Sequence, residues 1–333
     1  MRRYHCPSCQ QGLYFDNTAC LSCGAELGFD PAAGFLLLDD DTARACANRA
    51  IIGCNWVAAG PDGRCLSCAH TAILPNLSVG GNAEKWARLE QAKRAVILML
   101  DRLGLPLVDA AGAPAPVFEF KADPPGPNAP RVLTGHENGT ITLNIAEADD
   151  AERARIREEM HEPYRTLPGH FRHEVAHHYW DVLTGADPRL LDTLRAVFGD
   201  DRQDYGASLA AHYAEGPPAD WAERYISAYA SSHPWEDFAE TWAHVLHVLE
   251  GLETAQAFGL IAGSGLPEGG LRAMAAVPME QLARAWIDLS IALNAVNQAM
   301  GHDTFYPFVL SPAIIEKMET VRRLIIEGGQ KAP

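Results

Sequence analysis

The sequence has no long uninterrupted apolar stretch. The longest apolar run beside a helical pattern, Ala95–Leu100, has six residues, whereas a membrane-spanning helix needs about 20. The opening residues, MRRYHCPSCQQGLYF, contain two arginines but no apolar segment after them, so they do not read as a secretory signal. We therefore expect a cytoplasmic protein that does not enter a membrane.

Positive charge is also scarce. The 333 residues include 27 lysines and arginines against 43 aspartates and glutamates, a formal net charge of −16. Residues 1–75 hold five basic against seven acidic side chains. Because nucleic-acid binding needs a basic face that neutralises phosphates, we do not expect a nucleic acid as a partner. The composition does not predict the oligomeric state.

Cysteine is absent beyond residue 68. The first four of the eight form two C-x-x-C pairs that are separated by ten residues, namely Cys6 with Cys9 and Cys20 with Cys23. This spacing is typical of a zinc ribbon, because each pair turns tightly enough for two thiolates to bind one ion. Two disulfides are the alternative, but they are rare in a reducing compartment. We predict a first structural zinc site here.

The other four cysteines, Cys46, Cys54, Cys65 and Cys68, are less regularly spaced. Only the last two form a C-x-x-C pair. A second closed zinc site is the best interpretation. The alternative is that Cys46 or Cys54 is only a small buried residue. His70 could replace a thiolate, although four cysteines already suffice.

Periodicity predicts the remaining elements. An amphipathic helix is expected over residues 84–103, followed by short strands and, from about residue 152, a mostly helical chain. The expected strands are Val117–Lys121, Arg131–Thr134 and Thr140–Ile145. Four helices are expected in this part of the chain. The first runs from Pro168 to Gly185 and the second from Pro234 to Gly251. The third carries an apolar stripe of Leu282, Trp286, Leu289, Leu293, Val296 and Met300, and the fourth begins at Ser311-Pro312. Tyr205, Tyr213 and the tryptophans are expected in the core.

The stretch GHFRHEVAHHYWDVL holds four histidines, and His173 and His177 bracket Glu174 in the order H-E-x-x-H. On a helix, residues four apart lie on one face, so both histidines can bind one ion. Glu174 lies beside them and can act as the general base. We expect His170 and His178 not to be ligands.

A catalytic zinc needs a third protein ligand. The pattern H-E-x-x-H-x-x-G-x-x-H does not supply it, because Trp180 and Leu183 stand at its glycine and its last histidine. A glutamate from a later helix is the other source. Glu236 and Glu240 lie one turn apart, so Glu236 could bind the ion while Glu240 holds a ligand histidine. A surface role for Glu240 is the alternative.

The segments HEVAHHYWDVL and YASSHPWEDFAETWAHVLHV resemble the bacterial zinc-binding metallopeptidases that carry an N-terminal zinc-ribbon region. The resemblance extends upstream to CANRAIIGCNW and CLSCAHTAILPNLS and downstream to YPFVLSPAIIEKM. It therefore covers nearly the whole chain through several separate motifs in order. It implies a zinc-dependent activity on a protein or peptide substrate.

The catalytic motifs are also similar to the gluzincins of the anthrax lethal factor kind. In those proteins the zinc-ligand helix reads E-x-F-A-E, and a catalytic tyrosine precedes the ligand glutamate by seven residues. Here EDFAE begins at Glu236, and Tyr229 stands seven residues before it. Tyr229 would then stabilise the oxyanion. Tyr225 is a nearby rival, and a plain packing role is the other alternative. The implied zinc ligands are His173, His177 and Glu236.

Two functions follow from these patterns. The first is a zinc-dependent peptidase of the HExxH-plus-glutamate type, in which a zinc-bound water activated by Glu174 attacks a peptide bond. The alternative is a zinc-ribbon binding or adaptor protein with a non-catalytic zincin scaffold. The first function requires one catalytic and two structural zinc ions. A strand just upstream of the zinc helix commonly pairs with an extended substrate, and Thr140–Ile145 is the candidate for that strand.

The predicted fold class is α+β. We expect a zinc ribbon at residues 1–38, a second four-cysteine module at residues 39–80 and a helical connection at residues 81–110. A mostly helical zincin-like metallopeptidase domain with a small β-sheet is expected at residues 111–330.

Overall fold

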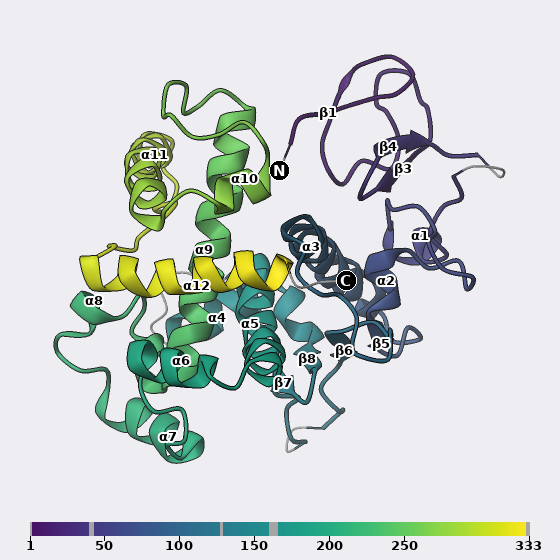
Figure 1. Cartoon of the computed structure of the whole chain (residues 1–333). Helices are drawn as coiled ribbons and strands as arrows, with labels where there is room; N and C mark the ends of the chain where they lie inside the picture. The colour runs from purple at the N-terminus through teal and green to yellow at the C-terminus, as the bar shows by residue number, and fades with distance from the viewer. Residues whose placement is uncertain (1, 40–42, 127–128, 160–165, 331–333) are drawn as a thin grey trace. The chain divides into compact units, whose positions relative to one another are not determined.

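The computed structural model describes residues 2–39, 43–126, 129–159 and 166–330 (Figure 1). The chain divides into two compact units. The first comprises residues 1–101 and 106–153, and the second comprises residues 102–105 and 154–333. Helices α3 (Asn82–Leu103) and α4 (Asp150–Glu159) run across the division.

The first unit contains two small hairpins and one four-stranded sheet. The hairpins pair β1 with β2 and β3 with β4, and the larger sheet has the order β5-β6-β8-β7. The strands are β1 (Tyr4–His5), β2 (Gly12–Leu13), β3 (Leu27–Asp30), β4 (Gly34–Leu37), β5 (Thr71–Ile73), β6 (Val117–Lys121), β7 (Gly135–Glu137) and β8 (Thr140–Asn144), and the short helices are α1 (Arg49–Ile52), α2 (Leu66–Ala69) and η1 (Ile145–Ala148).

Five aromatic side chains form the core of the N-terminal part. Phe29 lies at the centre, with ring centroids 5.5 Å from Tyr4, 5.0 Å from Phe15, 5.3 Å from Phe35 and 5.7 Å from Trp56. The contacts with Tyr4, Phe15 and Phe35 are edge-to-face, a geometry that adds to the stabilisation from burial. Because Trp56 lies in the second cysteine segment, the two cysteine segments share one core.

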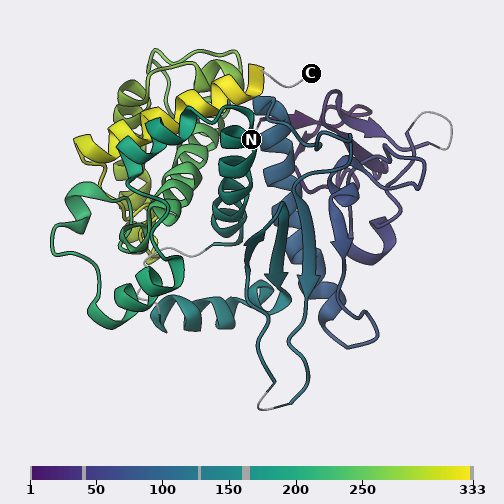
Figure 2. The same ribbon diagram turned by 60° about the horizontal axis from the view of Figure 1, so that its bottom comes forward.

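The four-stranded sheet packs against helix α3 (Figure 2). Strands β5, β6 and β8 are parallel, and β7 is antiparallel to β8. The Lys93 ammonium lies 5.5 Å from the ring centroid of Phe118 and 5.6 Å from that of Phe120, both on β6. It pairs with the equally buried Glu90 at 3.0 Å, and this pairing compensates the burial of both charges.

One predicted strand is wrong. Residues 131–134 are not in a strand, and β7 begins only at Gly135. Side chains of the neighbouring segment bind this backbone instead, since the Val132 amide donates to Asp123 Oδ1 at 2.7 Å. Side-chain bonding of this kind competes with sheet pairing. The prediction for Val117–Lys121 is confirmed at both ends.

The strand proposed to pair with a substrate lies inside the sheet. β8 pairs with β6 along Thr140–Asn144 and with β7 along Thr140–Thr142. Its backbone is therefore already paired on both sides over Thr140–Thr142, and a peptide cannot add to it there. The expectation that this strand pairs with a substrate is therefore contradicted over Thr140–Thr142, where β7 already occupies its edge.

The second unit is helical. Its helices are α5 (Leu167–Ala186), α6 (Leu190–Phe198), α7 (Tyr205–Glu215), α8 (Trp221–Arg224), η2 (Tyr229–Ser232), α9 (Pro234–Ala257), α10 (Leu271–Ala275), α11 (Met279–Ala299) and α12 (Pro312–Gln330). Helix α9 is central, and α5, η2, α11 and α12 all pack against it (Figure 1). Helix α12 begins where the sequence predicted, with Ser311 Oγ accepting from the Ile314 amide at 3.2 Å.

Gly251 does not end helix α9, which continues to Ala257. A Cβ atom at this position would lie 2.3 Å from Cζ3 of Trp286 on α11. The glycine therefore permits close packing of two helices, and its role is not that of a helix stop.

The predicted stripe on α11 is also only partly buried, since Val296 is 57% and Met300 70% exposed.

The α+β class is confirmed: a region with small sheets precedes a mostly helical one. Among the described residues, no helix is long and apolar enough to cross a membrane.

Candidate active site and structural metal centres

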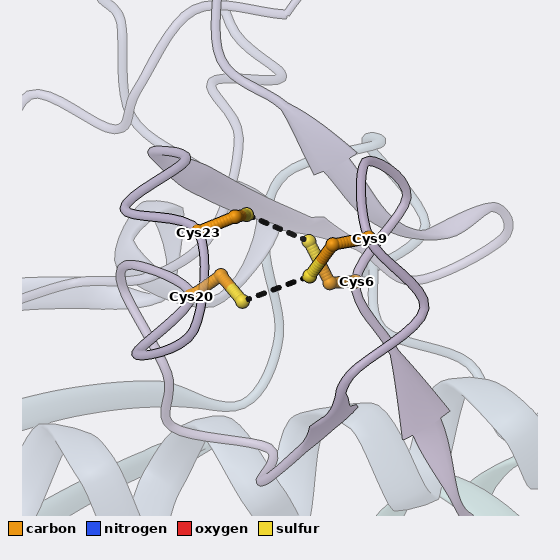
Figure 3. Close-up of side chains that lie close together, drawn as sticks. All are labelled: Cys6, Cys9, Cys20 and Cys23. Atoms are coloured by element: carbon orange, nitrogen blue, oxygen red, sulfur yellow. Dashed lines mark hydrogen bonds between the residues drawn. The ribbon is translucent and has the colours of Figure 1, made fainter.

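The first four cysteines lie on two equivalent turns (Figure 3). In the first, the Gln10 amide donates to the Cys6 carbonyl at 2.9 Å, and in the second the Gly24 amide donates to the Cys20 carbonyl at 2.9 Å. Both Gln10 and Gly24 have positive φ values, 62° and 75°. Each turn folds back so tightly that its two sulfurs face those of the other turn.

The four sulfurs are spaced as zinc ligands. Sγ atoms lie 3.8 Å apart between Cys6 and Cys23 and 3.6 Å apart between Cys9 and Cys20. A tetrahedral zinc ion with bonds of about 2.3 Å separates its sulfurs by about 3.8 Å, whereas a disulfide bond is about 2.05 Å long. Cys6 and Cys20 are buried, while Cys9 and Cys23 are exposed.

The second cysteine group is wholly buried. Sγ of Cys54 lies 3.7 Å from that of Cys65 and 3.9 Å from that of Cys68. The Cys65 amide donates to Cys46 Sγ at 3.4 Å, and the Cys68 amide donates to Cys65 Sγ at 3.3 Å. All four sulfurs lie within 4.8 Å of one another. Buried thiolates with this spacing require a cation, and zinc satisfies the requirement.

His70 lies close to the second cysteine group but binds elsewhere. Its Nδ1 atom lies 2.8 Å from the Pro116 carbonyl oxygen. Burial, the largest cause, lowers the pKa of this imidazole to about 4. His70 is therefore a neutral buried side chain that ties Pro116, the residue before β6, to the cysteine module.

The H-E-x-x-H sequence lies in the middle of α5. Thr166 caps this helix, since its Oγ1 accepts from the Gly169 amide at 3.1 Å. His173, Glu174 and His177 are all buried. Because His173 and His177 are one turn apart, their Nε2 atoms approach to 3.2 Å.

Helix α9 brings Glu236 to the two histidines. Its first turn is set by His233, whose Nδ1 accepts from the Trp235 amide at 3.1 Å, and by Pro234 at the first helical position. Glu236 Oε2 lies 3.0 Å from His173 Nε2, and Oε1 lies 3.7 Å from His177 Nε2. The carboxylate itself is buried.

This cluster fits a zinc ion. Two imidazole nitrogens and one carboxylate oxygen lie within 4.8 Å of one another, and a tetrahedral zinc with bonds of about 2.0–2.2 Å separates such atoms by about 3.3–3.5 Å. Among the described residues, Glu236 Oε2 makes no hydrogen bond of good geometry although it is buried. Buried acceptors normally have a partner, and a cation at this point would provide one.

Glu240 fixes the orientation of His173. Its Oε1 lies 2.7 Å from His173 Nδ1, and its Oε2 accepts from Ser227 Oγ at 2.7 Å. A proton on Nδ1 leaves Nε2 with its lone pair directed at the cluster. Ser227 in turn accepts from the Ala230 amide at 3.0 Å. No sequence pattern predicted Ser227.

Glu174 lies beside His173 on α5 and is paired with His170. His170 Nε2 lies 3.2 Å from Glu174 Oε1, one helical turn earlier on α5. Burial raises the pKa of Glu174, but the hydrogen bond from His170 and the nearby imidazoles outweigh it, so the pKa lies below its usual value. The carboxylate is therefore ionised near neutral pH and can accept a proton. His170, expected to be a bystander, contacts the site through this pair.

Tyr229 lies beside His173 of the cluster. Its ring centroid is 6.1 Å from that of His173. Burial, and secondarily the charge of Glu236, raises the pKa of Tyr229 well above its usual value, so the hydroxyl keeps its proton. The ring of Tyr225 lies instead 4.2 Å from the Lys317 ammonium.

Tyr205 belongs to the site, which the sequence did not predict. Its hydroxyl donates to Glu236 Oε1 at 2.8 Å. The expectation that Tyr205 and Tyr213 are core residues is wrong, since they are 39% and 58% exposed on a helix with no buried residue. No periodic spacing in this helix indicates that Tyr205 contacts Glu236.

Two families match the chain. The one described as "zinc-ribbon domain" matches residues 3–79, and the one described as "Putative zinc-binding metallo-peptidase" matches residues 82–324. Proteins of Mycobacterium tuberculosis and Mycobacterium bovis, described as uncharacterized, are 41% identical over 331 residues, which cover 98% of this chain and 96% of each relative. No solved structure matches the chain.

The fold and the two four-cysteine groups define a zinc-binding protein with an N-terminal zinc ribbon. The chain belongs to the family described as "Putative zinc-binding metallo-peptidase". This confirms the resemblance to the zinc-binding metallopeptidases that carry an N-terminal zinc-ribbon region.

Proposed function

We propose that the protein is a zinc-dependent peptidase that hydrolyses peptide bonds. One observation carries the proposal. The Nε2 atoms of His173 and His177, 3.2 Å apart, meet Glu236 Oε2 at 3.0 Å from His173, with the buried Glu174 beside them. A catalytic metal site needs three ligands of this kind, an open position and a base.

The ligands proposed for this site are His173, His177 and Glu236. A zinc ion bound there supplies Lewis-acid chemistry, since it polarises a carbonyl and makes water more acidic. Glu240 acts on His173, because its bond to Nδ1 keeps Nε2 in the orientation that binding needs. Ser227 holds Glu240 in the same way.

Glu174 is the proposed general base. Its carboxylate takes the proton of the attacking water and passes it to the leaving amine of the peptide. The lowered pKa of Glu174 supports the first half of this role. His170, at 3.2 Å, keeps the carboxylate facing one way.

Tyr229 is the proposed stabiliser of the tetrahedral oxyanion. Its hydroxyl keeps its proton and can donate a hydrogen bond to developing negative charge. The position of its ring, 6.1 Å from that of His173, supports this role over a similar one for Tyr225.

The two cysteine groups are proposed as structural zinc sites, each closed by four thiolates. We propose that residues 1–38 and 39–80 form these modules, that residues 81–110 connect them to the rest, and that residues 111–330 form the peptidase domain. The substrate is a protein or a peptide, and the proposed location is the cytoplasm.

The test is cleavage of a peptide library by the zinc-loaded full chain and by Glu174→Gln. The variant keeps the size of the side chain and all proposed ligands, so its zinc content should equal that of the wild type. Its turnover should fall about 10²–10⁴-fold, the usual contribution of a general base.

Equal cleavage by Glu174→Gln would remove Glu174 from the mechanism. A zinc-loaded wild type that cleaves nothing in a broad library would favour the adaptor function, in which the same fold is a scaffold.

A further inference from the structure

Tyr205 contacts the metal cluster from an element that packing alone does not hold in place. It is the first residue of α7 (Tyr205–Glu215), which has no buried residue. Asp204 caps the helix, with Oδ1 accepting from the Ala207 amide at 2.7 Å. A helix that buries so little gains little stability from the hydrophobic effect. Specific contacts therefore matter more for its position.

Helix α7 touches the site through Tyr205 and through His212. The Tyr205 hydroxyl donates to Glu236 Oε1 at 2.8 Å. Seven residues later, the ring of His212 stands edge-on to that of Tyr229, with centroids 6.3 Å apart. Both contacts join α7 to residues of the proposed catalytic site.

The Tyr205 ring is held in a defined orientation. It meets the rings of His233 and Trp235 nearly perpendicularly, at centroid distances of 5.3 Å and 5.8 Å. The Trp235 ring lies 4.0 Å from that of His177. These contacts aim the hydroxyl at Glu236 without relying on the hydrogen bond itself.

The hydrogen bond from Tyr205 gives the two carboxylate oxygens of Glu236 different partners. Oε1 accepts from Tyr205 and lies 3.7 Å from His177 Nε2, whereas Oε2 lies 3.0 Å from His173 Nε2. Among the described residues Oε2 has no hydrogen bond of good geometry. A carboxylate can bind an ion through either oxygen or both, and a donor on one oxygen selects the other.

We infer that Tyr205 is a positioning residue of the third metal site: its hydroxyl holds Oε1 of Glu236 and presents Oε2 to the ion. The inference rests on the ligand set of the proposed function. Tyr205 acts through Glu236. The Tyr205 side chain is 39% exposed to solvent.

The test compares Tyr205→Phe with Tyr213→Phe in the full chain. Tyr205→Phe keeps the ring contacts and removes only the hydroxyl. Zinc should bind the third site about 10–100-fold more weakly, as when other outer partners of metal ligands are lost. Competition with a zinc chelator measures this affinity. Tyr213→Phe removes a hydroxyl from the same helix that lies near Tyr229, and the zinc affinity of this variant should match that of the wild type.

A second readout separates positioning from folding. With Co²⁺ in the third site, the visible absorption spectrum of Tyr205→Phe should differ from that of the wild type, because the carboxylate binds differently. The zinc content of the two cysteine sites should not change. Wild-type affinity together with a wild-type cobalt spectrum in Tyr205→Phe overturns the inference, as does an equal loss in Tyr213→Phe.

Both readouts need metal alone and no peptide. A wild type that binds a third zinc but cleaves no peptide would refute the proposed peptidase and leave the role of Tyr205 standing. A wild type without a third zinc would overturn both.

Discussion

The chain builds metal sites in two different ways. Each cysteine site takes all four ligands from one short segment, residues 6–23 or residues 46–68, and closes a tetrahedron with thiolates alone. The proposed histidine–glutamate site would take two ligands from α5 and one from α9, and its three side chains leave a tetrahedron incomplete. The first design suits structure, and the second suits chemistry.

The two designs also differ in what surrounds the ligands. Backbone amides donate to cysteine sulfurs, as Cys68 does to Cys65. The histidine site is supported by side chains, namely Glu240 on His173 and Tyr205 on Glu236. Because these supporting groups are side chains, a single substitution can remove one hydroxyl or carboxylate from the histidine site and leave the others in place.

The largest effect is expected at the buried cysteine site. Cys65→Ser should lose one zinc per chain and with it about 10 kcal/mol of metal-coupled folding energy. Cys9→Ser should lose less, because Cys9 is exposed and water can take its place at the ion. Elemental analysis, with hydrogen exchange over residues 2–39 for Cys9→Ser and over residues 43–79 for Cys65→Ser, would measure the difference. Equal losses in both variants would contradict the distinction between the two cysteine sites.

Loss of the Tyr229 hydroxyl should reduce turnover but not metal content. Tyr229→Phe is expected to lower kcat about 10²–10³-fold, as for other oxyanion donors. Tyr225→Phe, four residues earlier, is the matched control and should retain wild-type turnover. If Tyr225→Phe were the damaged variant, the assignment of the oxyanion donor would be reversed.

Gly251→Ala tests the helix packing that supports the second unit. The added methyl group would meet Trp286 at 2.3 Å, and such overpacking costs about 1–3 kcal/mol. Gly185→Ala is the control, since a Cβ atom there meets nothing within 4 Å. Urea unfolding would measure both, and an unchanged midpoint for Gly251→Ala would show that the helices can separate freely.

The smallest effect is expected at Ser227, which acts on the proposed metal site through Glu240 and then His173. Ser227→Ala removes the donor to Glu240 Oε2 and should weaken zinc binding at the third site about tenfold, or about 1.4 kcal/mol. Ser231→Ala is the control, because its hydroxyl donates to the Ala228 carbonyl at 2.7 Å and lies in the same turn. Chelator competition applies here too. Similar losses in both variants would point to a general loosening of η2.

The sequence predicted the parts of this structure that depend on local spacing. The cysteine pairs, the H-E-x-x-H turn and the start of α12 at Pro312 all follow from residues within one or two turns of each other. The grouping of Glu236 with the histidines also matched a pattern, although it spans two helices.

The sequence did not predict features that depend on distant partners. Gly251 reads as a helix stop, yet its role is to accommodate Trp286 from another helix. Tyr205 and Ser227 reach the site through single hydrogen bonds from segments without periodicity. Residues 131–134 are not in a strand, and the Val132 amide donates to the Asp123 side chain in place of a neighbouring strand. A single amino-acid sequence does not indicate such contacts, because they form only when distant segments come together in the fold.

We propose that a third metal site is built from α5 and α9. Elemental analysis of the purified wild type and of Glu236→Ala tests it most directly. The wild type should hold about three zinc ions per chain, and Glu236→Ala should hold one fewer with both cysteine sites still filled. Two zinc ions in the wild type, or an unchanged count in Glu236→Ala, would contradict the account.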